Sequence, residues 1–220
     1  MSVAGGGVLR GTEIDIPADI SSAAFFMVGA SIAPGSDLIL EHVGLNPTRD
    51  GVITILRAMG ANIEVSQART VGGEPVADLR IRYAPLRGID IPVEEVPLAI
   101  DELPAILVAA ACAEGVTVLR GAEELRVKES DRIASMAEGL TQLGIGNTVA
   151  PDGITVVGGT PSGGVITTHH DHRIAMSFAM AALRASDPII VTDCAHVATS
   201  FPGFAELAAN TGLRLTVTAS

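Results

Sequence analysis

Seven consecutive residues bring together the side chains best suited to chemistry. The segment Arg126-Val127-Lys128-Glu129-Ser130-Asp131-Arg132 holds three basic and two acidic groups, in a chain where only 18% of residues are charged. Lys128 is the only lysine in the sequence. A cation beside a carboxyl group, just ahead of a further arginine, could bind an anion and move a proton on it. The competing interpretation is a solvated helix start with local ion pairs, because surface charge clusters are common.

An amphipathic helix is expected directly after this segment, and it would position the charged groups. Apolar residues recur at helical spacing from Ile133 to Leu143, so a helix with one buried face is predicted to begin near Ser130, which can cap it. The free backbone N–H groups of its first turn and the guanidinium of Arg132 would then point the same way. This arrangement suits a phosphate or carboxylate ligand.

The same order of elements occurs three times from residue 21 onward, which predicts internal pseudo-threefold symmetry. Each copy begins with a polar residue and an almost wholly apolar helix, expected at residues 21–32, 101–113 and 171–183. A strand and a second, amphipathic helix follow, with the strands expected at 38–43, 116–119 and 189–191 and the helices at 50–59, 130–143 and 199–210. Further strands are expected at 8–16, 61–65, 78–82, 88–91, 154–157, 164–167 and 213–217.

These elements predict an α/β fold of three βαβαββ units, with buried, roughly parallel helices inside and sheets outside. The units are expected at about 11–75, 76–158 and 159–220, after a disordered start or linker over residues 1–10. Residues of helix-capping type stand at the expected helix starts, namely Ser21, Asn46, Asp101, Ser130, Asp171 and Thr199 or Ser200. Parallel helices would gather their positive ends on one face, so that face could bind a polyanionic small molecule.

Composition excludes several other classes of function. With 220 residues, 48% of them apolar, the chain can bury a sizeable core. A net charge of −11 and an aromatic share of 3% argue against nucleic acid as a partner. Two cysteines are too few for a disulfide framework, and the longest uncharged apolar run is too short to span a bilayer. No signal peptide opens the chain, so a cytoplasmic setting without membrane contact is expected.

Two motifs in order closely resemble the C-terminal half of the 5-enolpyruvylshikimate-3-phosphate (EPSP) synthases. The first is Arg126 to Arg132, and the second is Asp171-His172-Arg173-Ile174-Ala175-Met176-Ser177. The resemblance runs from about Gly11 to the end of the chain. It implies the enolpyruvyl transferase fold, in which two domains of three βαβαββ units enclose the active site. It also implies 3-phosphoshikimate 1-carboxyvinyltransferase activity, the shikimate-pathway step that leads towards chorismate and the aromatic amino acids.

The resemblance also implies a role for each of three catalytic residues. Asp101 corresponds to the carboxylate that accepts the proton from the 5-hydroxyl of shikimate 3-phosphate, and Lys128 lies beside that hydroxyl. Glu129 corresponds to the acid that protonates the methylene carbon of phosphoenolpyruvate and makes C2 electrophilic. One carboxyl group must be protonated and the other ionised, so their environments should move their pKa values apart.

Three further residues are expected to bind substrate. Arg132 and Arg173 match the arginines that hold the phosphate and carboxylate of phosphoenolpyruvate, and His172 lines the same site. No cofactor is implied. A metal site at His169, His170 and His172 is disfavoured, because consecutive residues on an extended segment point apart.

Several positions depart from the common pattern of the family. Thr199 replaces a lysine and Glu124 replaces an asparagine found in many members. Asn46-Pro47-Thr48-Arg49 resembles the Asn-x-Thr-Arg signature of the glyphosate-tolerant class, class II, in which a threonine at the Thr199 position also occurs. These residues favour that class.

The first half of the family pattern has no counterpart in this chain. The resemblance therefore predicts a C-terminal domain that is inactive alone, with the N-terminal half of the same enzyme as its partner. Because complete enzymes thread their extreme N-terminus into this domain, one sheet edge is expected to lack a strand. The alternatives are a UDP-N-acetylglucosamine enolpyruvyl transferase domain and a non-catalytic fragment that serves in binding or complementation.

Overall fold

The structure, a computed structural model, describes residues 2, 4–8 and 10–218. Its α-helices are α1 (Ile20–Ile32), α2 (Gly51–Ala58), α3 (Leu103–Ala111), α4 (Arg132–Gln142), α5 (His172–Ala181), α6 (Val197–Ser200) and α7 (Phe204–Asn210). Its strands are β1 (Asp37–Gly44), β2 (Asn62–Val71), β3 (Glu74–Arg82), β4 (Val116–Leu119), β5 (Asn147–Ala150), β6 (Gly153–Val157), β7 (Gly164–Thr167) and β8 (Ile189–Thr192). Short 3-10 helices occupy η1 (Val93–Glu95), η2 (Pro97–Ala99) and η3 (Glu123–Val127).

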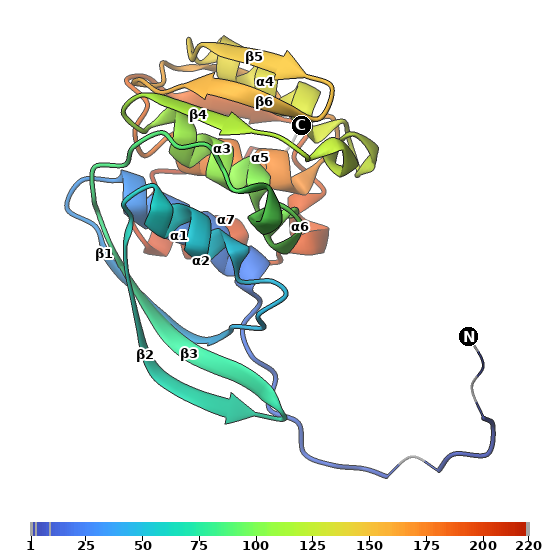
Figure 1. The fold of residues 1–220 in the computed structure, drawn as a ribbon. Helices are drawn as coiled ribbons and strands as arrows, with labels where there is room; N and C mark the ends of the chain where they lie inside the picture. The colour runs from blue at the N-terminus through green and yellow to red at the C-terminus, as the bar shows by residue number, and fades with distance from the viewer. Residues whose placement is uncertain (1, 3, 9, 219–220) are drawn as a thin grey trace.

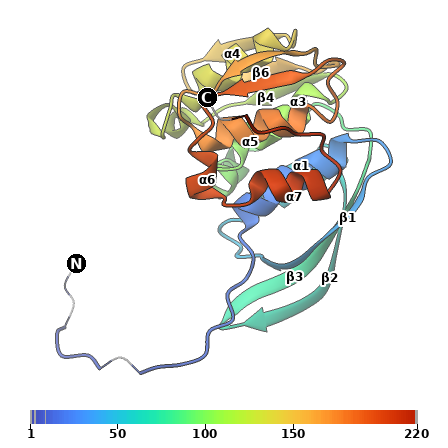
Figure 2. The ribbon, with the colours of Figure 1, turned by 180° about the vertical axis from the view of Figure 1, so that it is seen from behind.

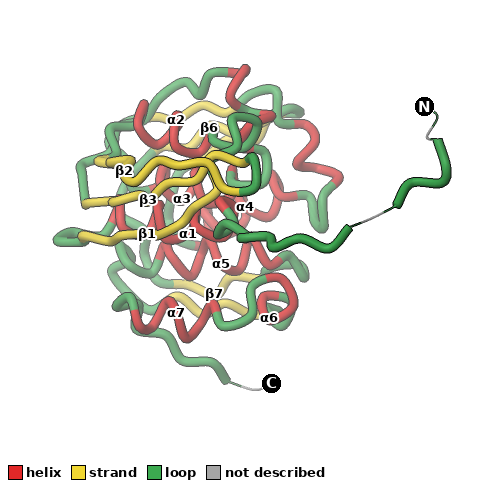
Figure 3. The backbone as a smooth tube through the Cα atoms, turned by 90° about the horizontal axis from the view of Figure 1, so that it is seen from below, coloured by secondary structure: helices red, strands yellow, loops and turns green. Residues whose placement is uncertain are grey.

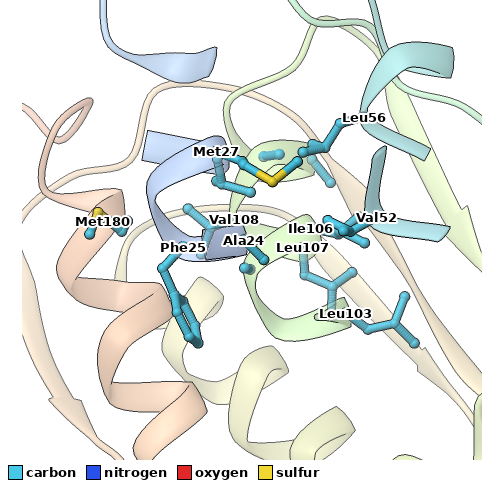
Figure 4. Close-up of a cluster of buried hydrophobic side chains, with 14 of the residues drawn as sticks. Ala24, Phe25, Met27, Val52, Leu56, Leu103, Ile106, Leu107, Val108 and Met180 are labelled. Atoms are coloured by element: carbon cyan, nitrogen blue, oxygen red, sulfur yellow. The ribbon is translucent and has the colours of Figure 1, made fainter. Parts of the chain in front are cut away.

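Three buried helices form the centre of the molecule. The first helix of each predicted copy, α1, α3 and α5, contacts the other two (Figure 1). Every residue of α3 is buried, and so is every residue of α1 except Ser22. In Figure 4 the side chains of Met27 and Leu107, from two of these helices, lie in one apolar cluster with Leu56 from α2. Burying each such side chain contributes about 1.5–3 kcal/mol, which explains why these segments are apolar nearly all round.

Three sheets lie around these helices in the described part of the chain. Two are antiparallel and three-stranded, in the orders β1-β3-β2 and β4-β6-β5, and the third pairs β7 with β8 in parallel. Figure 3 shows β1, β3 and β2 across one face of the helices. The boundary between the first two expected units, at residues 75 and 76, lies inside β3. The mixed α/β class expected from the sequence is therefore observed.

The longest hairpin depends on two glycines. β2 and β3 pair from Asn62–Arg82 through to Val71–Glu74, so only Gly72 and Gly73 remain to make the turn. Their φ angles are 60° and 92°. Two consecutive residues with positive φ match the right-handed twist of a two-residue hairpin, and glycine adopts that conformation without steric cost.

Three expected strands are not formed, because none of these segments pairs along its length with a neighbouring strand in the described part of the chain. Residues 8 and 10–16 form no strand, and Ile14 and Ile16 are 72% and 79% exposed; Leu9 lies outside the described residues. Residues 213–217 form no strand either, although Leu213 is buried. Residues 88–91 contribute only an isolated bridge from Asp90 to Val118. Alternating side chains do not make a strand unless a neighbouring strand accepts the backbone hydrogen bonds.

β5 was not predicted from the sequence. It forms because it pairs with β6.

Several helix starts differ from those expected. Asp19 rather than Ser21 caps α1, and Asp131 rather than Ser130 caps α4. The last expected helix, from Thr199, is split into α6 and α7 (Figure 2). The break is at Phe201-Pro202-Gly203, because a residue before proline avoids helical angles and Gly203 has a φ of 82°. The N-cap positions of α2, α3, α5, α6 and α7 are Asp50, Glu102, Asp171, His196 and Gly203. Of these only Asp171 is a cap that the sequence predicted.

The start of the chain carries no helix or strand among its described residues up to Pro17. The expected disordered start falls partly on Met1, Val3 and Leu9, which lie outside the described residues. Within the described part of the chain, no helix has the length and apolar character needed to cross a membrane.

Candidate active site

Asp101 lies at the centre of a group of basic side chains. Its Oδ1 is 3.4 Å from Arg132 Nη1 and 3.6 Å from Lys128 Nζ. Its Oδ2 is 3.8 Å from Arg173 Nη2 and 3.9 Å from Arg49 Nη2. The four cations come from four places: the loop before α2, the end of η3, and the first turns of α4 and α5. The packing of α1, α3 and α5 therefore brings residues of all three copies to one carboxylate.

These cations lower the pKa of Asp101. Burial by itself would raise the pKa of the carboxyl group, because it disfavours the charged form. Arg173, Lys128, Arg132 and Arg49 outweigh burial, so the pKa of Asp101 is lower than its usual value. Asp101 is therefore ionised at neutral pH, which is the state required of a carboxylate that accepts a proton.

Arg132, the first residue of α4, is part of a buried ion pair. Its side chain is 1% exposed, and its Nε donates to Asp171 Oδ2 at 2.8 Å. Asp171 is 0% exposed, caps α5 through the N–H of Arg173 at 2.9 Å, and accepts a hydrogen bond from Ser130. These contacts lower the pKa of Asp171 despite its burial. Ser130 was expected to cap α4, but its hydroxyl instead helps to fix Asp171.

Glu129 and Lys128 lie beside this buried pair and are partly exposed to solvent. The carboxylate of Glu129, which is 50% exposed, accepts a hydrogen bond from Arg132 Nη2. Lys128 Nζ donates to Glu124 Oε1 at 2.5 Å, and this contact raises the pKa of the lysine. Glu124 therefore pairs with Lys128, the second nearest cation to Asp101 Oδ1 after Arg132. An ammonium group has three N–H donors, so Lys128 can still donate to a ligand.

Arg173 and His172 complete the set that the sequence singled out. Arg173 Nη1 donates to the backbone carbonyl of Asp101 at 2.9 Å. Burial, followed by the charge of Arg173, lowers the pKa of His172, which favours the neutral imidazole. Both side chains line a shallow hollow together with Ser21 and Ser200. Thr199, the neighbour of Ser200, does not line it.

Comparison with known proteins identifies the family of the chain. The family model described as EPSP synthase (3-phosphoshikimate 1-carboxyvinyltransferase) matches residues 1–207. The chain belongs to the EPSP synthase family. Proteins named 3-phosphoshikimate 1-carboxyvinyltransferase from Alkalilimnicola ehrlichii and Methylococcus capsulatus are each 66% identical to it, over 97% and 96% of this chain. The chain spans 48% of the length of each of these EPSP synthase relatives.

Solved structures place the fold in the same family. EPSP synthase from Acinetobacter baumannii is 56% identical to this chain, with a TM-score of 0.94 over 97% of this chain and 50% of that one. The enolpyruvyl transferase NikO from Streptomyces tendae, at 20% identity and a TM-score of 0.66, shares the fold. Among the EPSP synthase relatives named here, each is about twice the length that the chain covers.

Sequence reasoning missed three residues of this cluster. Arg49 is the fourth cation beside Asp101, and Ser21 and the buried Glu102 lie next to it. Arg49 stood in a motif noted only as a class signature, and Ser21 was noted only as a helix cap. Glu102 directly follows Asp101, but nothing local indicates that its side chain is buried. Their proximity results from the packing of α1 and α3 and the loop before α2.

No group of three or more His, Cys, Asp or Glu side chains in residues 2, 4–8 and 10–218 is arranged to hold a metal ion. His169 contacts Glu138 at 3.0 Å, and His170 contacts Asp193 at 2.7 Å. Each of these histidines therefore has a single acidic partner, at a different place on the surface.

Acid should destabilise the folded chain through Asp101 and Asp171. Their pKa values are lower in the folded chain than in the unfolded chain, so their ionised forms favour folding. This contribution is complete above the unfolded-state pKa of about 3.9 and is lost as the pH falls through the folded values. Urea unfolding at successively lower pH should show the loss beginning near that value. Asp101→Asn should make the decline shallower, and equal declines in both proteins would contradict the assignment.

Proposed function

We propose that the chain is the C-terminal half of a 3-phosphoshikimate 1-carboxyvinyltransferase. In this reaction the enolpyruvyl group passes from phosphoenolpyruvate to the 5-hydroxyl of shikimate 3-phosphate, and phosphate is released. The observation that carries the proposal is the ionised Asp101 among four cations, with the carboxyl group of Glu129 within the same cluster. A base, an acid and a group of anion-binding side chains are the parts that such a transfer requires.

In the proposed mechanism, Asp101 accepts the proton of the 5-hydroxyl while that oxygen bonds to C2 of phosphoenolpyruvate. Glu129 supplies a proton to the methylene carbon, which makes C2 electrophilic. The ionised Glu129 then takes a proton back from that carbon as the bond between C2 and the phosphate oxygen breaks, so the double bond is restored. Lys128, Arg132 and Arg173 stabilise the negative charge on the departing phosphate.

Arg132 illustrates how a ligand would enter this site. Its Nε, Nη1 and Nη2 already contact Asp171, Asp101 and Glu129, and its side chain is 1% exposed. An anion can therefore reach Arg132 only where the half-exposed Glu129 moves aside. In the proposed mechanism this movement also frees the carboxyl group of Glu129 to face the bound phosphoenolpyruvate. His172 and Arg173 line the neighbouring hollow, so we assign both to substrate binding.

The proposal is tested by phosphate release from shikimate 3-phosphate and phosphoenolpyruvate. The chain is assayed alone and then mixed with a separately made N-terminal half of the Alkalilimnicola ehrlichii relative. We expect phosphate only from the mixture. Robust turnover by the chain alone would contradict the half-enzyme assignment. Turnover with UDP-N-acetylglucosamine in place of shikimate 3-phosphate would indicate the sister activity instead. A folded mixture that turns over neither acceptor would favour a binding role.

We also propose that the chain belongs to the glyphosate-tolerant class, class II. The support is the Asn46-Pro47-Thr48-Arg49 segment together with Thr199. The active mixture should accordingly keep most of its phosphate release when glyphosate is added at concentrations that inhibit a sensitive enzyme. Inhibition equal to that of the sensitive enzyme would contradict the class assignment.

A further inference from the structure

Arg49 lies at the Asp101 cluster but has no role in the mechanism above. It precedes α2, and its guanidinium is 3.9 Å from Asp101 Oδ2 and 3.5 Å from Glu102 Oε1. Its Nη2 donates to Ser21 Oγ at 2.8 Å. We propose that Arg49 is a further substrate-binding residue, which holds a phosphate or carboxylate group of the ligand beside Asp101. This inference rests on the proposed function, because the ligand is one of the two anionic substrates.

The first argument is that Arg49 has donors to spare. A guanidinium carries five N–H donors. Among the described residues, the side chain of Arg49 makes one hydrogen bond and is 45% exposed. Arg132, by contrast, has its three nitrogens on three carboxylates and is 1% exposed. Arg49 can therefore bind an incoming anion without first breaking the buried contacts that hold α4 and α5.

The second argument is that a buried carboxyl group holds Arg49 in place. Glu102, which is 1% exposed, accepts a hydrogen bond from Ser21 Oγ, the same hydroxyl that accepts from Arg49. Its Oε2 is buried without a hydrogen-bond partner among the described residues. A buried carboxylate is tolerated only beside compensating charge, and Arg49 and Arg173 are the cations within reach, at 3.5 Å and 3.9 Å. Glu102 and Ser21 thus orient a side chain that would otherwise be free on the surface.

The third argument is the charge balance of the cluster. Four cations, Arg49, Lys128, Arg132 and Arg173, lie among five carboxyl groups, namely Asp101, Glu102, Glu124, Glu129 and Asp171. With five carboxyl groups to four cations, the cluster has no excess positive charge, so the binding of anionic substrates depends on every cation that it has. Removing Arg49 would leave Asp101 and Glu102 less compensated and would increase their repulsion of an incoming phosphate or carboxylate.

The test compares Arg49→Gln and Arg49→Lys with a control, Arg57→Gln. Arg57 is on α2, only eight residues further along, and its Nη2 donates to the Ile63 carbonyl away from the cluster. Phosphoenolpyruvate and shikimate 3-phosphate are titrated separately into the chain, and binding is followed by NMR of the arginine side-chain N–H signals. Thermal unfolding of each variant checks that it is folded, and Arg49→Lys provides a second variant that retains the positive charge.

We expect Arg49→Gln to weaken binding of at least one substrate by about 10-fold or more, as the loss of a hydrogen bond to a charged group implies. Arg49→Lys should recover part of the affinity, and Arg57→Gln should bind like the unaltered chain. In the active mixture, Arg49→Gln should raise the KM for the same substrate with little change in kcat, the pattern of lost substrate binding.

Equal affinities of Arg49→Gln and Arg57→Gln for both substrates would overturn the inference, and so would an unaltered chain that binds neither. These outcomes are separable from failure of the proposed function. Substrate binding that depends on Arg49, without turnover in any mixture, would support the role of Arg49 and contradict the transferase assignment. Turnover with an unchanged KM in Arg49→Gln would support the transferase and overturn the role of Arg49.

Discussion

Asp171→Ala is expected to lower the free energy of unfolding by about 3–5 kcal/mol, because the buried Nε of Arg132 loses its carboxylate partner. Arg132 and Asp171 are 1% and 0% exposed and are joined at 2.8 Å. The substitution also removes the cap of α5 and the acceptor of the Ser130 hydroxyl. Chemical denaturation followed by circular dichroism at neutral pH measures the change.

A matched control distinguishes the buried pair from a partly exposed capping residue. Asp131 caps α4 through the N–H of Ala134 at 3.0 Å and pairs with Arg126 at 2.7 Å, but its side chain is 38% exposed. Asp131→Ala should therefore cost only about 1 kcal/mol. Combining Asp171→Ala with Arg132→Met should recover part of the loss, because the buried guanidinium that lost its partner is then absent. Equal effects of Asp131→Ala and Asp171→Ala would show that the buried pair adds nothing beyond capping.

Glu129→Gln should abolish most activity without unfolding the chain. A positioned general acid contributes about 10²–10⁴-fold to a rate, so phosphate release by the active mixture should fall by that factor. The substituted amide would keep the shape of the side chain and its contact with Arg132 while losing the proton that the mechanism transfers. Because Glu129 is 50% exposed, the free energy of unfolding should change little.

The control for this prediction is Glu138→Gln on α4, the helix that follows Glu129 in the chain. Glu138 is 53% exposed and contacts His169 away from the Asp101 cluster, so its loss should leave phosphate release unchanged. Initial rates at saturating concentrations of both substrates provide the measurement. A Glu129→Gln mixture that retained activity within about threefold of the unaltered one would rule out Glu129 as the acid, since an effect of about 10²-fold or more is expected.

The three expected strands that are not formed show that a strand depends on a neighbouring strand to accept its backbone hydrogen bonds. Residues 10–16 alternate in the way a strand does, yet Ile14 and Ile16 are exposed. The sheet of the third unit has only β7 and β8 in the described chain, whereas the other two sheets have three strands each. Backbone pairing is a property of two segments, so the pattern of one segment cannot decide it.

The sequence by itself determined the helices and the residue types of the site. Apolar runs that would be costly to expose predict the buried α1 and α3, and Asp171 was identified as a cap because capping depends on neighbouring residues only. The charged motif and its resemblance to the EPSP synthases supplied Lys128, Glu129 and Arg132. Helix caps and helical periodicity can be predicted from the sequence because they depend on residues only a few positions apart.

Only the tertiary structure decided which groups meet at Asp101. Arg49 and Ser21 come from the first copy and Arg173 from the third, and no spacing in the sequence relates them to Glu102. Ser130 could have capped α4, but the proximity of Asp171 directs its hydroxyl across to α5. Distances, burial and shared hydrogen bonds between distant segments arise when the three central helices pack. That packing is why the pKa of Asp101 is lowered and why Arg49 lies 3.9 Å from its carboxylate.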